Sequence, residues 1–302
     1  MEFLTELQLL LGEENVYVNE PMSSHTTFRT GGNAGYFVTP GCADDIIATV
    51  EICRQNSVPY YVVGNGSNLL VSDSGYDGVI IHIGNRISYI ITEGEYITAG
   101  AGALLSKIGA AALDESLTGF EFAAGIPGTI GGGCIMNAGA YGGELKDVLV
   151  KVKAVTPEGI IKEYTVDEIN PGYRHTVFTG KNYIILEAVI KLKKGDRTEI
   201  AAEMSRLAAL RRAKQPLEYP SAGSTFKRPE GYFSGQLIES AGLKGKGAGD
   251  ACVSPKHAGF IINKGNASAK DIYDTIEMVT EEVMRVHGVK LEPEVRLIGS
   301  FS

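Results

Sequence analysis

The most restrictive feature of this chain is the glycine-rich segment AAGIPGTIGGGCIMNAGAYGG at residues 123–143. Together with Gly119, it contains nine glycines within 25 residues. Glycines at this density indicate a backbone that turns with positive φ or closely approaches another group. The interleaved Ile126, Ile130 and Ile135 are apolar and favour burial, which argues against a floppy loop. We therefore favour a backbone packed tightly against a flat or charged cofactor.

A second glycine-rich loop, Gly64-Asn65-Gly66-Ser67-Asn68, follows an expected strand at 60–64. Successive backbone N–H groups in such a loop can form a nest for a phosphate group. Asn-Gly is equally a signal for a plain hairpin turn. No Gly-Lys-Ser/Thr follows, so the loop is not a nucleotide-binding P-loop. From these residues alone, the phosphate site and the plain turn remain equally open.

Charge and composition exclude several classes of function. The net charge of -8 argues against a protein that binds duplex nucleic acid. No C-x-x-C pair or Cys/His cluster has metal-ligand spacing, so we expect no metal site and free thiols in a reducing compartment. The start of the chain lacks a signal-peptide pattern, and no apolar run approaches the ~20 residues of a membrane helix. We expect a soluble, cytoplasmic monomer.

Hydrophobic periodicity predicts two α+β units. Helices are expected at 1–12, 44–56, 104–116, 196–215 and 268–288, and strands or hairpins at 60–64, 78–83, 87–100, 151–165, 183–194 and 293–302. The first unit spans 1–195 and is rich in hairpins and glycine. The second spans 196–292, and the final strand, 293–302, returns to the first unit.

Three polar residues stand out as candidates for chemistry. Ser224 lies in SAGSTFKRP, without a G-x-S-x-G turn or a histidine nearby in the sequence. A nucleophilic serine needs a base, and none lies nearby in the sequence, so the role of the Ser224 hydroxyl stays open from these residues alone. Arg174 could bind a carboxylate or phosphate through its planar fork, or form a surface salt bridge. Glu294, taken alone, is an edge charge at the start of the last strand.

Six motifs, in order, resemble the UDP-N-acetylenolpyruvoylglucosamine reductase family over nearly the whole chain. They are HTTFRTGG (25–32), VVGNGSNLLV (62–71), GIPGTIGGGCIMNAGAYG (125–142), GYR (172–174), AGSTFKRP (222–229) and PEVRLIG (293–299). The resemblance implies an α+β fold of the vanillyl-alcohol-oxidase type, which binds FAD. Two FAD-binding subdomains, at about 1–58 and 59–195, would precede a separate substrate-binding domain.

The resemblance also implies the site residues. Expected FAD contacts are Gly64, Asn65, Gly66, Ser67, Asn68, Leu69, Gly125, Ile126, Pro127, Gly128, Thr129, Gly131, Gly132, Asn137, Ala138 and Gly139. Arg174 is expected on the enolpyruvyl carboxylate, Ser224 as the proton donor and Glu294 as the catalytic carboxylate. Expected substrate contacts are Tyr173, Lys227, Arg228, Gln236, Lys244 and Asn263.

The implied reaction uses NADPH and FAD to reduce the enolpyruvyl ether of UDP-N-acetylglucosamine, with hydride delivered to C3 and a proton to C2. One alternative is an FAD-dependent sugar or lactone oxidase of the same fold, in which Cys134 is the only obvious residue for covalent attachment of FAD. A second alternative is a non-catalytic UDP-sugar-binding protein. Thr176 stands where many relatives have serine, and 175–183 leaves no room for the extra tyrosine loop of longer relatives.

Overall fold

The structure is a computed structural model that describes residues 2–301. By their packing, these residues form two compact units, and neither unit is continuous in sequence. The first contains the chain up to Tyr17 together with Tyr36–Asn65 and Gly78–Leu210. The second contains Val18–Gly35, Gly66–Asp77 and the chain from Arg211 onward.

The helices that were predicted from periodicity are present. The helices are α1 (Phe3–Leu11), α2 (Ala43–Gln55), α3 (Leu105–Asp114), α4 (Ile130–Met136), α5 (Val166–Ile169), α6 (Arg197–Lys214), α7 (Ser234–Ser240) and α8 (Ala269–His287). The short helices α4, α5 and α7 were not predicted. Each has seven residues or fewer, which is too short to show a helical repeat of apolar residues.

The strands include the predicted hairpins and several short segments that the sequence did not reveal. They are β1 (Val16–Pro21), β2 (Asn33–Val38), β3 (Tyr60–Val63), β4 (Leu69–Val71), β5 (Tyr76–His82), β6 (Ile90–Glu93), β7 (Tyr96–Gly100), β8 (Leu117–Thr118), β9 (Gly139–Ala140), β10 (Gly143–Glu144), β11 (Leu149–Val155), β12 (Ile161–Thr165), β13 (Ile184–Lys191), β14 (Lys193–Lys194), β15 (Ala251–Val253), β16 (Ile261–Asn263) and β17 (Arg296–Ile298). The strands that were not expected are β1, β2, β4, β8, β9, β10, β15 and β16.

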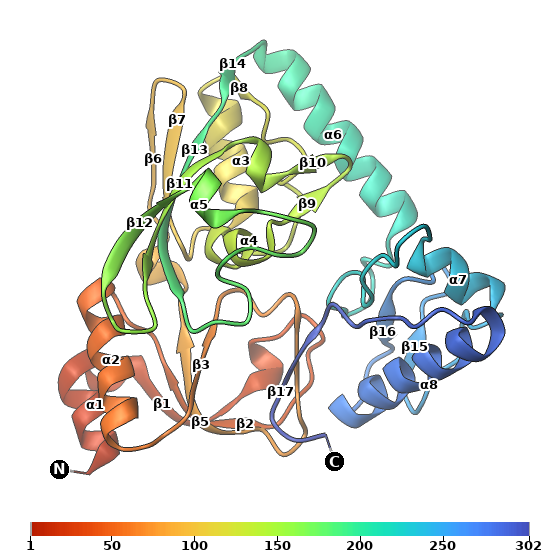
Figure 1. Ribbon diagram of the computed structural model, residues 1–302, viewed down its shortest axis with the longest axis horizontal. Helices are drawn as coiled ribbons and strands as arrows, with labels where there is room; N and C mark the ends of the chain where they lie inside the picture. Colours follow the sequence, from red (N-terminus) through yellow and green to blue (C-terminus); the bar gives the residue numbers. More distant parts are fainter. Residues whose placement is uncertain (1, 302) are drawn as a thin grey trace. The chain divides into compact units, whose positions relative to one another are not determined.

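A five-stranded antiparallel sheet organises the first unit, in the order β12-β11-β13-β7-β6. Its two hairpins turn where predicted, and Gly94, at the tip of β6–β7, has φ 64°. Helix α4 packs against β13, so the glycine-rich segment is held on the sheet (Figure 1). Ile97, Val152 and Ile190 are almost completely buried in the core of this unit.

A second sheet has the order β1-β2-β5-β3, with β3 and β5 parallel. Helices α1 and α2 pack side by side (Figure 1). Helix α1 ends at Gly12, which has φ 86°, as the sequence predicted. Strand β3 leads directly into the loop that begins at Gly64, which places the first glycine-rich loop at the end of a sheet strand.

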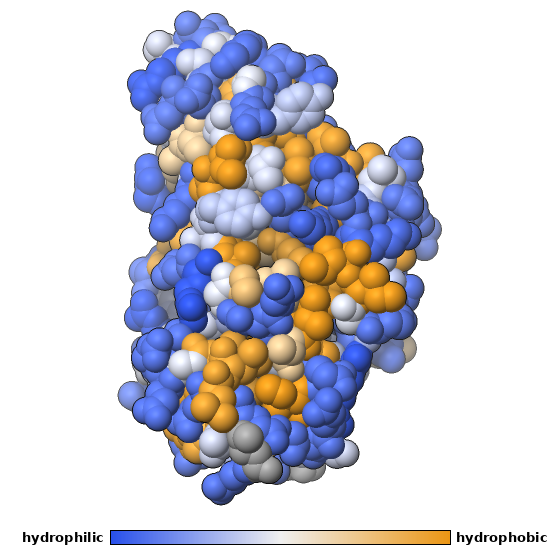
Figure 2. All heavy atoms as spheres, turned by 90° about the vertical axis from the view of Figure 1, so that its left-hand side faces the viewer, coloured by the Kyte–Doolittle hydropathy of each residue, from blue (hydrophilic) through white to orange (hydrophobic). Residues whose placement is uncertain are grey.

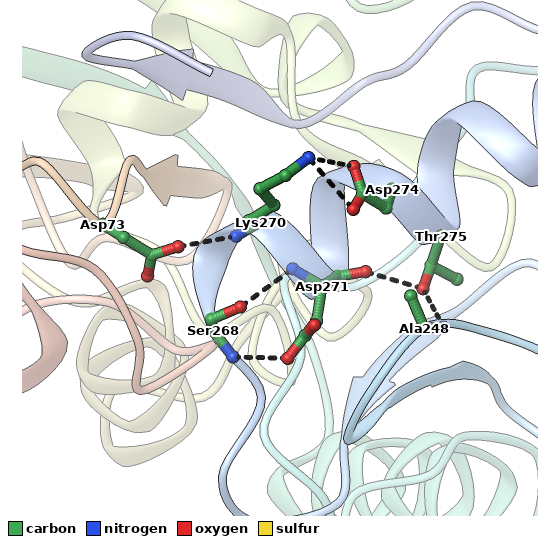
Figure 3. Close-up of polar contacts among 7 residues, drawn as sticks. All are labelled: Asp73, Ala248, Ser268, Lys270, Asp271, Asp274 and Thr275. Carbon is green, nitrogen blue, oxygen red and sulfur yellow. Dashed lines mark hydrogen bonds and ion pairs between the residues drawn. The ribbon is translucent and has the colours of Figure 1, made fainter. Parts of the chain in front are cut away.

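Helix α8 is the longest element of the second unit. Its apolar face is buried through Ile272, Ile276 and Val279. The predicted capping box is present, because Ser268 Oγ accepts the Asp271 N–H at 3.0 Å while Asp271 Oδ2 accepts the Ser268 N–H at 3.0 Å (Figure 3). This reciprocal pair satisfies two N–H groups that a helix start otherwise leaves unbonded.

Asp73 adds a second cap to the same helix end. Its carboxylate accepts the Ala269 N–H at 2.8 Å and the Lys270 N–H at 2.9 Å, the latter drawn in Figure 3. A carboxylate at a helix N-terminus is stabilised by the helix dipole. The contact fastens the 66–77 segment to α8, although the two are almost 200 residues apart in sequence.

The final strand also joins the second unit. Strand β17 pairs in parallel with β4, with Arg296 opposite Leu69 and Ile298 opposite Val71. Strand β4 lies within 1–195, the region to which the final strand was predicted to return, whereas the compact units group β4 and β17 with the chain from Arg211 onward. The boundaries at 195 and 292 stay predictions. Discontinuous units of this kind depend on pairings between segments distant in sequence, which periodicity does not report.

The surface carries hydrophobic patches separated by hydrophilic residues on the face drawn in Figure 2. Scattered exposed apolar residues are normal for a folded protein. Within the described residues, no helix is long and apolar enough to cross a membrane. The same residues contain no group of three or more His, Cys, Asp or Glu side chains arranged to hold a metal ion.

Candidate active site

Two glycine-rich loops contact each other in the first unit. Asn65 Nδ2 donates a hydrogen bond to Pro127 O at 2.7 Å. A Cβ atom on Gly64 would lie 2.5 Å from Thr129 Oγ1, closer than real side chains approach. Glycine at position 64 therefore allows the two backbones to meet. The backbone at Gly64 and Asn65 therefore lies against the glycine-rich segment at Pro127 to Thr129.

Three successive N–H groups of the first loop are available to a ligand. Within residues 2–301, the backbone N–H groups of Asn65, Gly66 and Ser67 donate no hydrogen bond. Gly66 has φ 60°, and a Cβ there would lie 1.9 Å from His25 O, so this position requires glycine. Consecutive N–H groups form a nest for anionic oxygens. The loop therefore fits the pyrophosphate of a dinucleotide such as FAD.

Helix α4 has two different glycine faces. A Cβ on Gly131 would lie 2.9 Å from Ala101 Cβ, and one on Gly133 would lie 2.8 Å from Leu145 Cδ1. These two glycines allow the helix to pack closely on its neighbours. Gly132, by contrast, is exposed, and among the described residues the one atom within 4 Å of its hypothetical Cβ, apart from its chain neighbours and the backbone of its own helix, is Thr129 Oγ1 at 3.7 Å. Without a side chain at Gly132, a flat cofactor could approach the backbone of this helix face closely.

The other predicted cofactor residues of the second loop contribute mainly to local structure. Gly128 O accepts the Leu105 N–H at 3.0 Å, and Ile126 packs against the core. Ala138 N–H donates to Gly133 O at 2.9 Å, and Gly139 pairs with Glu144 in β9–β10. Gly125 and Pro127, in contrast, are exposed. In the first loop, Leu69 is buried in β4. The exposed positions are the ones suited to contact a ligand.

Arg174 occupies a strained turn. Gly172 and His175 exchange backbone hydrogen bonds at 2.8 and 3.3 Å, with Tyr173 and Arg174 between them. Arg174 has φ 52°, a left-handed conformation that is uncommon for a residue with a side chain. Its guanidinium carbon lies 5.4 Å from the centroid of the Tyr173 ring. Such strain costs about 1–3 kcal/mol and is concentrated at functional sites.

Asn137 holds this turn. Its side chain is buried, and Nδ2 donates to Gly172 O at 3.1 Å and to Glu144 Oε2 at 2.8 Å, while Oδ1 accepts the Lys146 N–H at 3.0 Å. The side chain of Lys146 also donates a hydrogen bond to Glu144, and this bond is the main cause that lowers the pKa of Glu144. Asn137 and Arg174 lower it further by smaller amounts. The side chain expected to contact the cofactor therefore bonds within the protein and fixes the segment that carries Arg174.

Thr176, which stands where many relatives have serine, is buried beneath the same turn. Thr176 Oγ1 donates to Ile135 O at 2.9 Å, and Thr179 Oγ1 donates to the same oxygen at 2.8 Å. Serine would supply the same hydroxyl. The substitution therefore keeps the contact that ties the 172–179 segment to the end of α4.

Ser224 and Glu294 are neighbours in the second unit. Glu294 N–H donates to Thr225 O at 2.7 Å, and Thr225 N–H donates to Gly259 O at 2.9 Å, so three chain segments lie side by side. The Ser224 hydroxyl is partly exposed and donates a long, 3.3 Å hydrogen bond to Phe226 O. Since this bond is weak, the hydroxyl can turn towards a substrate at little cost.

His257 belongs to the same cluster and was missed as a candidate. A Cβ on Gly259 would lie 3.0 Å from His257 Cε1 and 3.7 Å from Ser224 Oγ, so both groups border one small space. Burial, aided by the positive charges of Lys244 and Lys214, lowers the pKa of His257. Its Nδ1 accepts the Gly259 N–H at 3.1 Å. The motif HAGFIIN held the signal, but no spacing linked its histidine to Ser224.

The predicted cationic contacts of the second unit are paired at the surface. Lys227 Nζ lies 3.1 Å from Glu292 Oε2, and Lys244 Nζ lies 2.6 Å from Glu239 Oε1. Exposed ion pairs contribute about 0–1 kcal/mol. An incoming diphosphate can therefore displace the glutamates at little cost.

Arg228 and Gln236 are exposed. The Arg228 guanidinium carbon lies 4.7 Å from the centroid of the Phe233 ring, and 54% of Phe233 is exposed. A guanidinium that lies over an aromatic face is held in place, yet its N–H edge can still meet an anion. Both residues remain predicted substrate contacts.

Asn263 has a different environment. It is 1% exposed, Nδ2 donates to Phe28 O at 3.0 Å, and Oδ1 accepts the N–H groups of Gly265 at 2.8 Å and Ala267 at 3.0 Å. These contacts shape the turn after β16 and tie it to Phe28, and Asn263 stays a predicted substrate contact.

Comparison with known proteins identifies the family. Residues 215–298 match the family model of the UDP-N-acetylenolpyruvoylglucosamine reductase C-terminal domain, and residues 34–165 match that of an FAD binding domain. A UDP-N-acetylenolpyruvoylglucosamine reductase of Clostridium perfringens is 48% identical over 99% of this chain and 98% of its own. The chain belongs to the UDP-N-acetylenolpyruvoylglucosamine reductase family. A reductase of Agathobacter rectalis is 50% identical over 94% of each chain.

Solved structures agree with this family and confirm the predicted fold class. The UDP-N-acetylenolpyruvylglucosamine reductase of Thermus caldophilus matches with a TM-score of 0.81 and 33% identity, over 94% of this chain and 98% of its own. A 4-ethylphenol oxidase of Gulosibacter chungangensis shares the fold, with a TM-score of 0.50 and 16% identity over 96% of this chain and 64% of its own. As the resemblance implied, the fold is an α+β FAD-binding fold, and the family uses FAD.

Proposed function

We propose that this protein reduces the enolpyruvyl ether of UDP-N-acetylglucosamine to UDP-N-acetylmuramate, with FAD as cofactor and NADPH as electron donor. The observation that carries the proposal is the hydrogen bond from Glu294 N–H to Thr225 O, which joins the segments that carry Ser224 and Glu294. A proton donor and a carboxylate on adjoining segments, in a chain that belongs to this family, match the needs of a reaction that ends by protonating carbon. Bound FAD would supply the hydride that C3 of the enolpyruvyl group receives.

Arg174 binds the enolpyruvyl carboxylate in this proposal. Its planar fork can donate two parallel hydrogen bonds to one carboxylate. The turn between Gly172 and His175 and the Asn137 contact to Gly172 O keep its backbone fixed. Negative charge that develops at C2 is conjugated with that carboxylate, so Arg174 stabilises the transition state more than the ground state.

Ser224 donates the proton to C2. A serine hydroxyl has a high pKa, so it is a poor acid for ordinary leaving groups, but a carbanion-like carbon is basic enough to accept its proton. The single weak hydrogen bond to Phe226 O leaves the hydroxyl able to reorient. Glu294, held beside Thr225, polarises the enolate system. Lys227, Arg228, Gln236 and Lys244 bind the UDP part.

The oxidase alternative is less well supported. Covalent attachment through Cys134 would need an accessible thiolate. Cys134 is 1% exposed, and burial raises the pKa of its thiol to about 12. The thiol is therefore protonated and enclosed in the core at neutral pH. Likeness to the 4-ethylphenol oxidase extends to the fold alone at 16% identity.

The decisive experiment separates the two half-reactions. Under anaerobic conditions, NADPH should bleach the flavin, and the enolpyruvyl substrate should restore it. Ser224→Ala should slow reoxidation by the substrate by roughly 10²–10⁴-fold, the range for general acid catalysis, with reduction by NADPH nearly unchanged.

Ser221→Ala, in the same loop, is the matched control and should behave like the unmodified protein. Equal losses in both half-reactions for Ser224→Ala would mean that the residue shapes the site rather than donating the proton. Restoration of the flavin by oxygen alone would favour an oxidase. A chain that takes up no FAD would exclude both enzymes.

A further inference from the structure

Asn68 links the first glycine-rich loop to the segment that carries Glu294. Its side-chain Nδ2 donates a hydrogen bond to Glu294 O at 3.0 Å. Its main-chain carbonyl accepts the Arg296 N–H at 2.9 Å. Asn68 therefore contacts the chain on both sides of Val295. It is the last residue of the loop whose Asn65, Gly66 and Ser67 N–H groups are available to a pyrophosphate.

The backbone of Glu294 is consequently held from two directions. Its N–H donates to Thr225 O at 2.7 Å, and its carbonyl accepts from Asn68. Hydrogen bonds at both ends of one residue limit the rotations that set the direction of its side chain. The orientation of the Glu294 carboxylate is therefore determined by two segments, one next to Ser224 and one that continues the cofactor loop.

The segment that follows Asn68 is fixed as well. Strand β4 pairs with β17 from Leu69 to Val71. Ser72 N–H donates to Ile298 O at 2.8 Å, and Asp73 caps α8 (Figure 3). Before Asn68, Gly66 O accepts the Thr27 N–H at 3.2 Å and Asn65 Nδ2 donates to Pro127 O, while the N–H groups of Asn65, Gly66 and Ser67 are left to bind a ligand.

We propose that Asn68 is a positioning residue for Glu294: its side-chain amide joins the ordering of the 64–68 loop around the cofactor to the placement of the catalytic carboxylate. The proposal rests on the proposed function, in which Glu294 is catalytic. It assigns the cofactor contacts of this loop to the main-chain N–H groups and gives the Asn68 side chain another partner.

The chemistry of asparagine suits this task. The contact needs an N–H donor of short reach, because the acceptor is a carbonyl oxygen. An ionised aspartate has the same shape but no proton to donate, so it would repel that oxygen. A protonated aspartic acid, in contrast, can donate an O–H. Asn68→Asp therefore converts the contact into one that pH switches.

The test uses the holoenzyme variants Asn68→Ala and Asn68→Asp, with Asn85→Ala as an exposed asparagine control. For Asn68→Ala we expect reoxidation of the flavin by the enolpyruvyl substrate to slow about tenfold, as for loss of one partly buried hydrogen bond. Reduction by NADPH and the Kd for FAD should stay within about threefold, and the loss should appear in kcat rather than KM. These limits distinguish positioning of the carboxylate from a general defect.

Asn68→Asp adds a signature that a merely structural role would not give. Its reoxidation rate relative to the unmodified protein should rise as pH falls from about 6.5 to 4, towards the ordinary aspartate pKa of about 3.9, because the protonated acid can donate to Glu294 O. Asn68→Ala should show no such rise. A flat ratio for Asn68→Asp across this range overturns the proposal.

Hydrogen exchange gives a readout that does not depend on the reaction. FAD should slow exchange in the peptide that contains Glu294, and Asn68→Ala should abolish this FAD-dependent protection. Weakened FAD binding with normal reoxidation per bound flavin would make Asn68 a cofactor ligand and overturn the proposal. If the substrate fails to reoxidise the flavin of the unmodified protein, the proposed function is overturned instead. The hydrogen-exchange result would still decide whether Asn68 links the 64–68 loop to Glu294.

Discussion

Adjacent glycines of α4 allow a sharp test of the cofactor surface. Gly132→Ala adds a methyl group whose nearest neighbour, Thr129 Oγ1, would lie 3.7 Å away, an ordinary contact. Alanine is better than glycine inside a helix by roughly 0.5–1 kcal/mol. The FAD-free protein should therefore keep or gain stability. If Gly132 faces FAD, the same methyl group intrudes on the cofactor and weakens its binding.

Gly131→Ala is the matched comparison, one residue away in the same helix. Its methyl group would lie 2.9 Å from Ala101 Cβ and 3.0 Å from Ala101 O. Because part of this neighbour is backbone, the helix must move, and overpacking costs about 1–3 kcal/mol. This exceeds the gain in helix propensity. Gly131→Ala should therefore lower the free energy of unfolding of the FAD-free protein, whereas Gly132→Ala should not.

The assays are thermal or urea unfolding after removal of FAD, followed by titration with FAD. We expect Gly132→Ala to raise the Kd for FAD at least about tenfold, equivalent to roughly 1.4 kcal/mol, with a melting temperature no lower than that of the unmodified protein. Normal FAD affinity in Gly132→Ala would refute the assignment of this helix face to the cofactor. Loss of stability in Gly132→Ala would refute the argument from space around the glycine.

Two further variants test individual side chains. Arg174→Lys keeps the charge but loses the planar fork, so turnover with the enolpyruvyl substrate should fall by about ten- to a hundredfold; near-normal turnover would remove Arg174 from the mechanism. The pKa of His257 is lowered in the folded state, so the unfolded state binds more protons and stability falls as pH drops below about 6.5. The free energy of unfolding, measured in urea between pH 5 and 7.5, should depend less on pH in His257→Gln. An unchanged pH dependence would contradict the lowered pKa of His257.

Long elements could be predicted from the sequence because their signals are local. The capping box at Ser268 and the glycine at 288 are interactions within a few residues, and both are present at the ends of α8. Helix α4 escaped prediction for the opposite reason. Three consecutive glycines, 131–133, oppose helix formation on propensity alone. The close approach to Ala101 and Leu145 stabilises the helix, and that packing exists only after the chain has folded.

The candidate site shows the same division. Ser224, Arg174 and Glu294 could be selected because each lies in a motif of the family. The hydrogen bond from Glu294 N–H to Thr225 O, next to Ser224, could not be predicted, since it joins segments far apart in the sequence. The place of His257 near Ser224 could not be predicted for the same reason. Only the fold brings its ring to the space beside Ser224 Oγ.

Two asparagines illustrate what motif recognition leaves open. Asn68 and Asn137 were both expected to contact FAD, yet their amide groups donate to carbonyl oxygens of the protein, those of Glu294 and Gly172. Gly172 begins the turn that presents Arg174. Each glycine-rich segment thus has exposed backbone or available main-chain N–H groups and an asparagine side chain that bonds to a segment carrying a predicted catalytic residue. A motif specifies which residues are present, whereas the direction of each side chain depends on partners that lie far away in the sequence.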